Sequence, residues 1–138
     1  MTDDEWRAFV SEGTRTGKLA IVRKNGFPHV VPVWFVVDGD DIVFNTGEAT
    51  VKGRAIARDG RVSMCVDEED PPYSYVQLNG RATVSDDLEE LRKFATLIGA
   101  RYMGADRAEE FGARNGVPGE LLVRFTPDHV VAERDVAD

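Results

Sequence analysis

Short apolar runs separated by turn residues fill the first half of the chain, and this pattern predicts β-strands. The runs are residues 19–22, 30–37, 42–44, 61–66 and 73–84. Asn25-Gly26 joins the first two as a tight hairpin, because these residues readily adopt the positive φ angles that such turns require. We expect a bulge at Asn79-Gly80 to bend the last run. Five strands therefore precede any long helix.

Apolar residues at helical spacing appear first near the N-terminus and again after the fifth strand. Residues 3–12 predict a short amphipathic helix that Thr2 or Asp3 can cap. A longer helix follows Asp86, which we place at the N-cap with Glu89 completing a capping box. Its apolar stripe must lie against the sheet and consists of Leu88, Leu91, Phe94, Ala95, Ile98 and Tyr102.

The last part of the chain adds a short helix and the final strands. Residues 106–114 predict a helix that Asn115-Gly116 and Pro118 stop. Residues 121–125 predict a sixth strand, and residues 130–131 are candidates for a separate terminal strand.

Six or seven short strands joined mostly by tight turns favour a mainly β fold of the α+β kind. We expect an antiparallel barrel with a few flanking helices rather than a parallel α/β sheet. The length and the 42% hydrophobic composition predict that residues 1–138 form one domain. Side chains fill the interior of so small a barrel, so a large ligand must lie outside it or between two copies. If the ligand is a cofactor, we expect a dimer.

Charge and hydropathy exclude several classes of function. The formal net charge of -8 disfavours general binding to nucleic acid or anionic lipid. No apolar run approaches the roughly 18 residues of a membrane span. Residues 1–6 have neither the basic nor the apolar region of a signal peptide, and the single Cys65 excludes an internal disulfide framework. We therefore expect a cytoplasmic protein.

Basic residues are concentrated in two stretches of this acidic chain. Residues 13–37 contain no acidic residue. A strand face exposed to solvent explains the basic residues of this stretch as well as a binding site does. Residues 52–61 contain one acid, Asp59, and here an anion-binding site is favoured. The basic residues of this second stretch are Lys52, Arg54, Arg58 and Arg61.

Several familiar catalytic motifs are absent. The two histidines, His29 and His129, are far apart in sequence, so no metal site is predicted. Residues 13–18 imitate a phosphate loop, but the glycines are too close together and a strand follows instead of a helix. Cys65 lies in mid-strand, where a buried structural thiol is expected. No G-x-S-x-G or G-x-G-x-x-G motif supports a hydrolase or a Rossmann fold.

A series of short motifs extends over most of the chain. In order they are GKLAIV at 17–22, NGFPH at 25–29, VPVWF at 31–35, DGD at 38–40, FNT at 44–46, Lys52, and ARDGRVS at 57–63. Their order and spacing resemble the flavin- and deazaflavin-binding split-barrel proteins, the superfamily of pyridoxamine phosphate oxidase and its F420-dependent relatives. The resemblance implies an FMN-binding split-barrel fold with six or seven antiparallel strands.

The resemblance also implies where a cofactor would lie. The residues expected against its ring are Val31, Pro32, Val33 and Trp34. A proline there lacks a backbone donor and leaves its neighbours free to meet the polar edge of the ring, although ordinary hairpin packing explains the same residues. Asn45 and Thr46 are expected beneath the cofactor tail.

The cofactor phosphate is expected at the start of the following helix. Thr50 can cap this helix, whose free N–H groups favour an anion, and Lys52 and Arg54 add positive charge. Residues 50–52 and 57–62 resemble the deazaflavin branch, so coenzyme F420 is the first choice and FMN the alternative. Thr50 and residues 53–55 depart from the residues usual in that branch.

The resemblance implies an F420-dependent oxidoreductase that transfers a hydride between the reduced deazaflavin and a small electrophilic substrate. It implies a homodimer with cofactor sites at the interface. Tyr73 and Tyr75 would then wall the substrate side of the ring from the partner subunit, and Tyr75 is a candidate proton donor beside solvent. The alternatives are an FMN-binding pyridoxamine phosphate oxidase-like protein and a non-catalytic flavin- or deazaflavin-binding protein.

Overall fold

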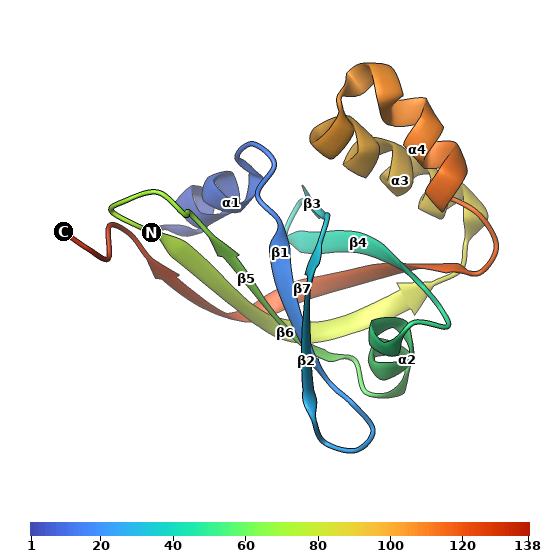
Figure 1. Ribbon diagram of the computed structural model, residues 1–138, viewed down its shortest axis with the longest axis horizontal. Helices are drawn as coiled ribbons and strands as arrows, with labels where there is room; N and C mark the ends of the chain where they lie inside the picture. Colours follow the sequence, from blue (N-terminus) through green and yellow to red (C-terminus); the bar gives the residue numbers. More distant parts are fainter.

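The computed structural model describes residues 1–138 and contains one continuous antiparallel sheet (Figure 1). Its strands are β1 (Gly17–Val22), β2 (Pro28–Val33), β3 (Val36–Asp38), β4 (Asp41–Gly47), β5 (Arg61–Asp67), β6 (Tyr75–Ser85) and β7 (Glu120–Glu133). They follow the order β2-β1-β5-β6-β7-β4-β3, so β2 and β3 are the two edges of the sheet. This arrangement confirms the predicted mainly β architecture with flanking helices.

Four α-helices flank the sheet: α1 (Asp3–Ser11), α2 (Val51–Arg58), α3 (Leu88–Met103) and α4 (Ala108–Asn115). Helix α1 begins with Thr2, one of the two predicted caps, as its N-cap, and Glu5 completes a capping box that was not predicted. The predicted capping box of α3 is wrong. Asp87, one residue later than Asp86, is the N-cap and accepts the N–H groups of Glu89 and Glu90. Because α3 begins at Leu88, only the Asp87 carboxylate is in position to reach these free groups.

The apolar run at 30–37, predicted as one strand, is broken into β2 and β3. Trp34 and Phe35 leave the strand ladder, and side chains of α3 satisfy the Phe35 backbone. The Tyr102 hydroxyl accepts the Phe35 N–H at 3.2 Å, and the Arg101 guanidinium donates to the Phe35 carbonyl at 2.6 Å. These contacts are non-local, which is why apolar periodicity alone predicted a continuous strand.

Strand β7 shows the opposite error, since one strand of 14 residues replaces the two that were predicted. Pro127 interrupts the sequence pattern, but the β6–β7 ladder accommodates it with a register shift at the expected position, Asn79-Gly80. Asn79 pairs with His129 and Gly80 with Pro127, so the extra residue lies on β7. A Cβ atom on Gly80 would lie 2.9 Å from the Thr126 carbonyl oxygen, so glycine permits this close crossing.

The main core lies inside the curled sheet, where α1 closes one end with Trp6 and Val10. Helix α3 packs on the outer side of β4 and β7 through a second cluster formed by Val43, Leu91, Phe94 and Leu122. The predicted α3 stripe is therefore correct at its centre. It is wrong at Leu88, which is 48% exposed because the first turn projects beyond the sheet. Helices α3 and α4 lie together at the top of Figure 1.

Candidate functional site

A pocket of about 330 Å³ lies where the ends of β2 and β4 meet α2 and the start of β7. We call it the Lys52 pocket. It is lined by Pro32, Val33, Trp34, Asn45, Thr46, Gly47, Lys52, Ile98, Asn115 and Glu120. Six residues that the sequence proposed for a cofactor thus surround one space, although they come from three separate segments.

The remaining three candidates lie beside this pocket without lining it. Val31 pairs with Leu19 on β1 and is half-buried. Arg54 is exposed on α2. Thr50 is the N-cap of α2: its hydroxyl accepts the Gly53 N–H at 3.1 Å and donates to the Gly47 carbonyl at 2.8 Å. Thr50 therefore shapes the loop that ends β4.

Lys52 is a half-buried cation that forms no ion pair with any carboxylate of the chain. It lies in the first turn of α2, a turn without acidic residues. Gly53 brings this turn against β4, since a Cβ atom there would lie 2.3 Å from the Gly47 carbonyl oxygen. An unpaired cation at a helix N-terminus favours an anionic group.

Trp34 forms the aromatic wall of the pocket and remains 36% exposed. Its ring stacks on Tyr102 at a centroid distance of 5.1 Å and an interplanar angle of 4°, and Phe111 packs against it at 5.8 Å. The Tyr102 hydroxyl also donates to the Arg15 carbonyl at 2.8 Å, and burial raises the pKa of Tyr102. Helix α3 thus fixes the orientation of the Trp34 ring.

The polar side of the pocket contains two residues that sequence reasoning missed. Glu120 accepts a hydrogen bond from the Asn45 side-chain amide at 3.0 Å. Asn115 lies at the end of α4, where the sequence indicated only a helix stop. The pairing of β4 with β7 brings Glu120 opposite Gly47, and no local motif signals that register.

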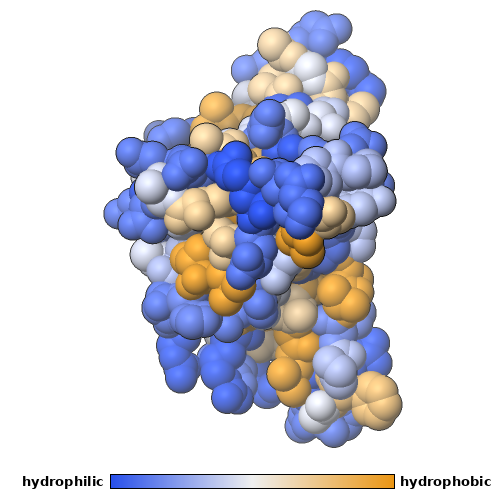
Figure 2. Space-filling view, turned by 90° about the vertical axis from the view of Figure 1, so that its left-hand side faces the viewer, coloured by the Kyte–Doolittle hydropathy of each residue, from blue (hydrophilic) through white to orange (hydrophobic).

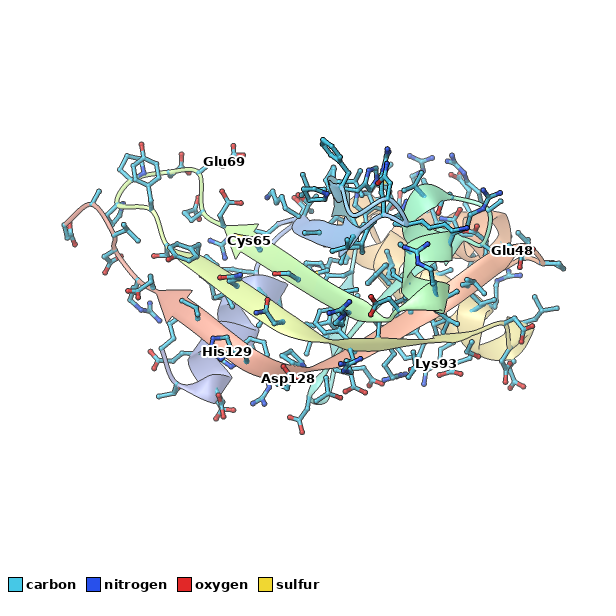
Figure 3. The ribbon with its side chains drawn as sticks, turned by 90° about the horizontal axis from the view of Figure 1, so that it is seen from below. Glu48, Cys65, Glu69, Lys93, Asp128 and His129 are labelled. Carbon is cyan, nitrogen blue, oxygen red and sulfur yellow. The ribbon has the colours of Figure 1, made fainter.

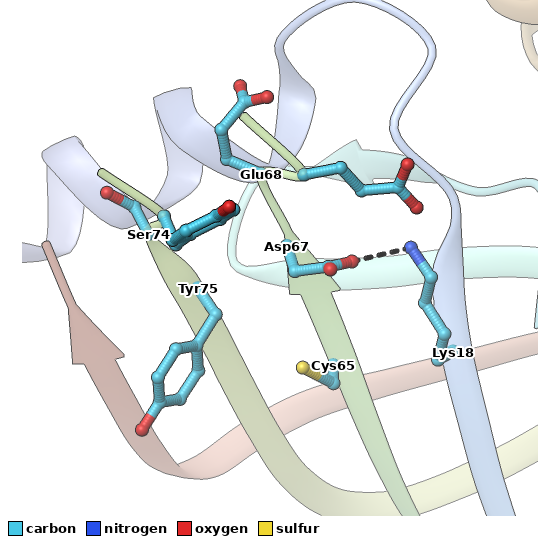
Figure 4. A pocket seen from close by; sticks show the side chains of 8 residues that line it. Lys18, Cys65, Asp67, Glu68, Ser74 and Tyr75 are labelled. Carbon is cyan, nitrogen blue, oxygen red and sulfur yellow. Dashed lines mark hydrogen bonds and ion pairs between the residues drawn. The ribbon is translucent and has the colours of Figure 1, made fainter. Parts of the chain in front are cut away.

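Tyr75 lies elsewhere, in a more open pocket of about 720 Å³ that we call the Tyr75 pocket (Figure 4). It is lined by Lys18, Cys65, Asp67, Glu68, Glu69, Tyr73, Ser74 and Tyr75. Figure 3 shows Glu69 of this pocket and Glu48, which follows the Lys52 pocket residue Gly47, at opposite ends of the molecule. One chain therefore cannot bring Tyr75 to a ligand in the Lys52 pocket.

The one cation that lines the Tyr75 pocket, Lys18, has a carboxylate partner. Lys18 pairs with Asp67 at 2.7 Å, as the dashed line in Figure 4 marks. Seen from this end, the surface is mostly hydrophilic with small, separated hydrophobic patches (Figure 2). Cys65 is half-buried rather than enclosed as predicted, because the side of β5 that carries it borders this open pocket. Burial and the nearby Asp67 raise the pKa of its thiol, which disfavours the nucleophilic thiolate.

No group of three or more His, Cys, Asp or Glu side chains is placed to hold a metal ion. None of the helices has the length and apolar character needed to cross a membrane.

Residues 2–132 match the sequence profile described as pyridoxamine 5'-phosphate oxidase. The chain belongs to this family. The family resemblance is thus confirmed, and the seven-stranded sheet with its four helices is the FMN-binding split barrel of the family. Proteins of the family bind flavins or deazaflavins and are often oxidoreductases.

Solved structures share this fold. A conserved hypothetical protein from Mycobacterium tuberculosis is 24% identical with a TM-score of 0.87, over 98% of this chain and 86% of that one. An F420 reductase is 26% identical with a TM-score of 0.71, over 90% of this chain and 94% of that one. The heme storage protein of Vibrio cholerae is 18% identical with a TM-score of 0.74, over 95% of this chain and 94% of that one. No curated protein matches the sequence.

Proposed function

We propose that this protein is an oxidoreductase that binds coenzyme F420 in the Lys52 pocket and reduces a small electrophilic substrate. The observation that carries the proposal is the unpaired Lys52 at one side of a pocket whose other side is apolar and aromatic. A flat ring with an anionic tail matches that polarity. When bound, the deazaflavin supplies a hydride; the residues of the chain bind and orient it.

The apolar side of the pocket suits the ring. Trp34 and Ile98 offer apolar surface, and β2 is an edge strand, so the backbone groups on its free edge are available to the polar rim of a heterocycle. Pro32 has no N–H and cannot compete with its neighbours for those contacts. The fixed stack of Trp34 on Tyr102 orders this wall before a ligand arrives, which reduces the entropic cost of binding.

Charge beyond the pocket favours F420 over FMN. Arg54 and Arg58 are exposed on α2 and form no ion pair, and Arg58 donates to the Val22 carbonyl at 2.9 Å, which holds it beside the β1–β2 hairpin. These cations suit an anionic tail longer than one phosphate. Similarity to an F420 reductase supports the same choice. The family match itself favours the alternative, an FMN-binding oxidase-like protein.

We further propose a homodimer in which the Tyr75 end of the partner covers the cofactor. A pocket of about 330 Å³ is too small to enclose a whole dinucleotide-sized cofactor. Large apolar side chains are also exposed on and around the β1–β2 hairpin: Val22 is 51%, Phe27 69% and Val30 65% exposed. Burying them between copies would bring a second chain beside the Lys52 pocket, with Tyr75 or solvent as the proton donor.

A parallel titration with F420 and FMN tests the cofactor. Trp34 lines the pocket whereas Trp6 is only 3% exposed, so a change in tryptophan fluorescence reports chiefly on Trp34. Tighter binding of F420 supports the proposal, and consumption of reduced F420 with an added acceptor separates an enzyme from a binding protein. Preference for FMN would replace the cofactor but retain the site. Binding of neither compound contradicts the proposal.

A further inference from the structure

Glu120 is the only acidic residue that lines the Lys52 pocket, and its carboxylate is incompletely used. One oxygen, Oε1, accepts the Asn45 amide at 3.0 Å. The other, Oε2, lies over Gly47, since an added Cβ atom on Gly47 would be 3.2 Å from it. No Lys or Arg comes within ion-pair distance of Glu120, although Lys52 lines the same pocket.

A free carboxylate oxygen is an unexpected feature in a pocket that suits an anionic ligand. Beside a phosphate it would raise the energy of the complex by like-charge repulsion. A carboxylate accepts hydrogen bonds only, so a group that fits against Oε2 must be a donor. The position of Glu120 on the polar side of the pocket, together with Asn45 and Thr46, suggests a neutral donor between the ring and the phosphate.

We propose that Glu120 binds the hydroxyl groups of a polyol chain that links the ring to the phosphate of the ligand. The proposal rests on the function proposed above and names the part of the ligand that Glu120 binds. Asn45 holds one carboxylate oxygen, which leaves the other, beside the pocket residue Gly47, free to accept a hydrogen bond from the ligand. Hydrogen bonds from hydroxyls to a charged acceptor are among the stronger ones, so this contact adds affinity that Lys52 does not supply.

Glu120→Gln tests the role with little change in shape. Glutamine keeps a side-chain oxygen for the Asn45 amide but loses the charge and one acceptor. Three flavin probes separate the parts of the ligand: lumiflavin has only the ring, riboflavin adds the polyol chain, and FMN adds the phosphate. We expect the affinity for riboflavin to fall about tenfold and that for lumiflavin to change less than about twofold. FMN is expected to bind more weakly as well.

Tighter binding of FMN by Glu120→Gln than by the wild type would overturn the inference. That is the result expected if the carboxylate only repels the phosphate. An unchanged riboflavin affinity would overturn it too, and would leave the proposed function intact if the wild-type protein binds these probes. If the wild-type protein bound none of riboflavin, FMN and F420, both the proposed function and the role of Glu120 would be overturned. Glu89→Gln, at an exposed position of α3, is the matched control, and equal thermal unfolding of the variants excludes a folding defect.

Discussion

The Lys52 pocket and the Tyr75 pocket differ in how they use their charges. In the Tyr75 pocket, Lys18 pairs with Asp67, and the nearby Arg15 pairs with both Glu12 and Glu68. In the Lys52 pocket, the cation has no partner within the chain. Arg101 is also half-buried without a carboxylate partner, but it donates to four backbone carbonyls, whereas the Lys52 ammonium has no hydrogen-bond partner within the chain.

The difference indicates which end takes the anionic part of a ligand. Charges that neutralise one another within the chain stabilise local structure and gain little from a ligand. A cation at a helix N-terminus without a counter-ion gains from each phosphate or carboxylate that arrives. This difference supports the proposal that the Lys52 pocket binds the anionic part of the ligand and that the Tyr75 end of the partner covers it.

The close approach of α2 to β4 at Gly53 shapes one side of the Lys52 pocket. Gly53→Ala would place a Cβ atom 2.3 Å from the Gly47 carbonyl oxygen, so α2 must move away from β4. We expect a loss of about 2 to 3 kcal/mol in the free energy of unfolding, measured by urea denaturation.

Gly13→Ala is the corresponding change near the other end of the molecule. It has open space but requires a positive φ, so we expect a loss of about 1 kcal/mol. A larger loss for Gly13→Ala than for Gly53→Ala would contradict the close contact described here.

Removing the unpaired cation tests the binding end directly. Lys52→Ala is expected to weaken binding of F420 or FMN by about 1 to 3 kcal/mol, with little change in stability, because a charge-assisted contact is lost. Isothermal titration of FMN and riboflavin in parallel isolates the phosphate contribution. Lys93→Ala on the exposed side of α3 is the control. If Lys52→Ala bound both compounds as the wild type does, Lys52 would not be the phosphate anchor.

The hydroxyl of Tyr102 tests whether the aromatic wall is held in place. Tyr102→Phe keeps the ring that stacks on Trp34 but leaves the Phe35 N–H without its partner and the Arg15 carbonyl with only the longer contact from Arg101. We expect a loss of about 1 kcal/mol in stability and a shift in the Trp34 emission maximum. Tyr73→Phe, an exposed tyrosine of the Tyr75 pocket, should change neither. An unaltered Trp34 emission in Tyr102→Phe would mean that the stack alone orients the ring.

Much of the fold could be predicted because it depends on local signals. The Asn25-Gly26 hairpin, the bulge at Asn79-Gly80 and the centre of the α3 stripe all follow from turn chemistry and periodicity. The break at Trp34 and Phe35 could not be predicted, because it depends on Arg101 and Tyr102, more than 60 residues away. The continuity of β7 likewise depends on its partner β6.

The candidate site shows the same division between local and distant signals. The motifs at 31–35, 44–46 and 50–54 predicted six of the residues that line the pocket, since each motif is a contiguous segment at the end of a strand or the start of a helix. Val31, Thr50 and Arg54 lie beside it. Glu120 and Asn115 join them through strand register and helix packing, and no motif marks them. The resemblance places Tyr75 beside the cofactor from the partner subunit. Within one chain Tyr75 lies at the other end, so this placement stays a prediction.

The smallest expected effect is a change in the free energy of unfolding when low pH neutralises Glu68 at the Tyr75 end. The hydrogen bond from Arg15 holds the pKa of Glu68 below its usual value, and the Asp70 N–H assists. A lowered pKa means that the contribution of Glu68 to stability is present above the pKa of the unfolded chain and is lost as pH falls through the folded value. Urea denaturation between pH 7 and about pH 3 should therefore show less acid destabilisation in Glu68→Gln than in wild type. Equal pH profiles would show that the ion pair between Arg15 and Glu68 contributes nothing to stability, as is true of many exposed pairs. The two ends of the molecule would then differ in whether their cations are paired, and not in how much those pairs stabilise the fold.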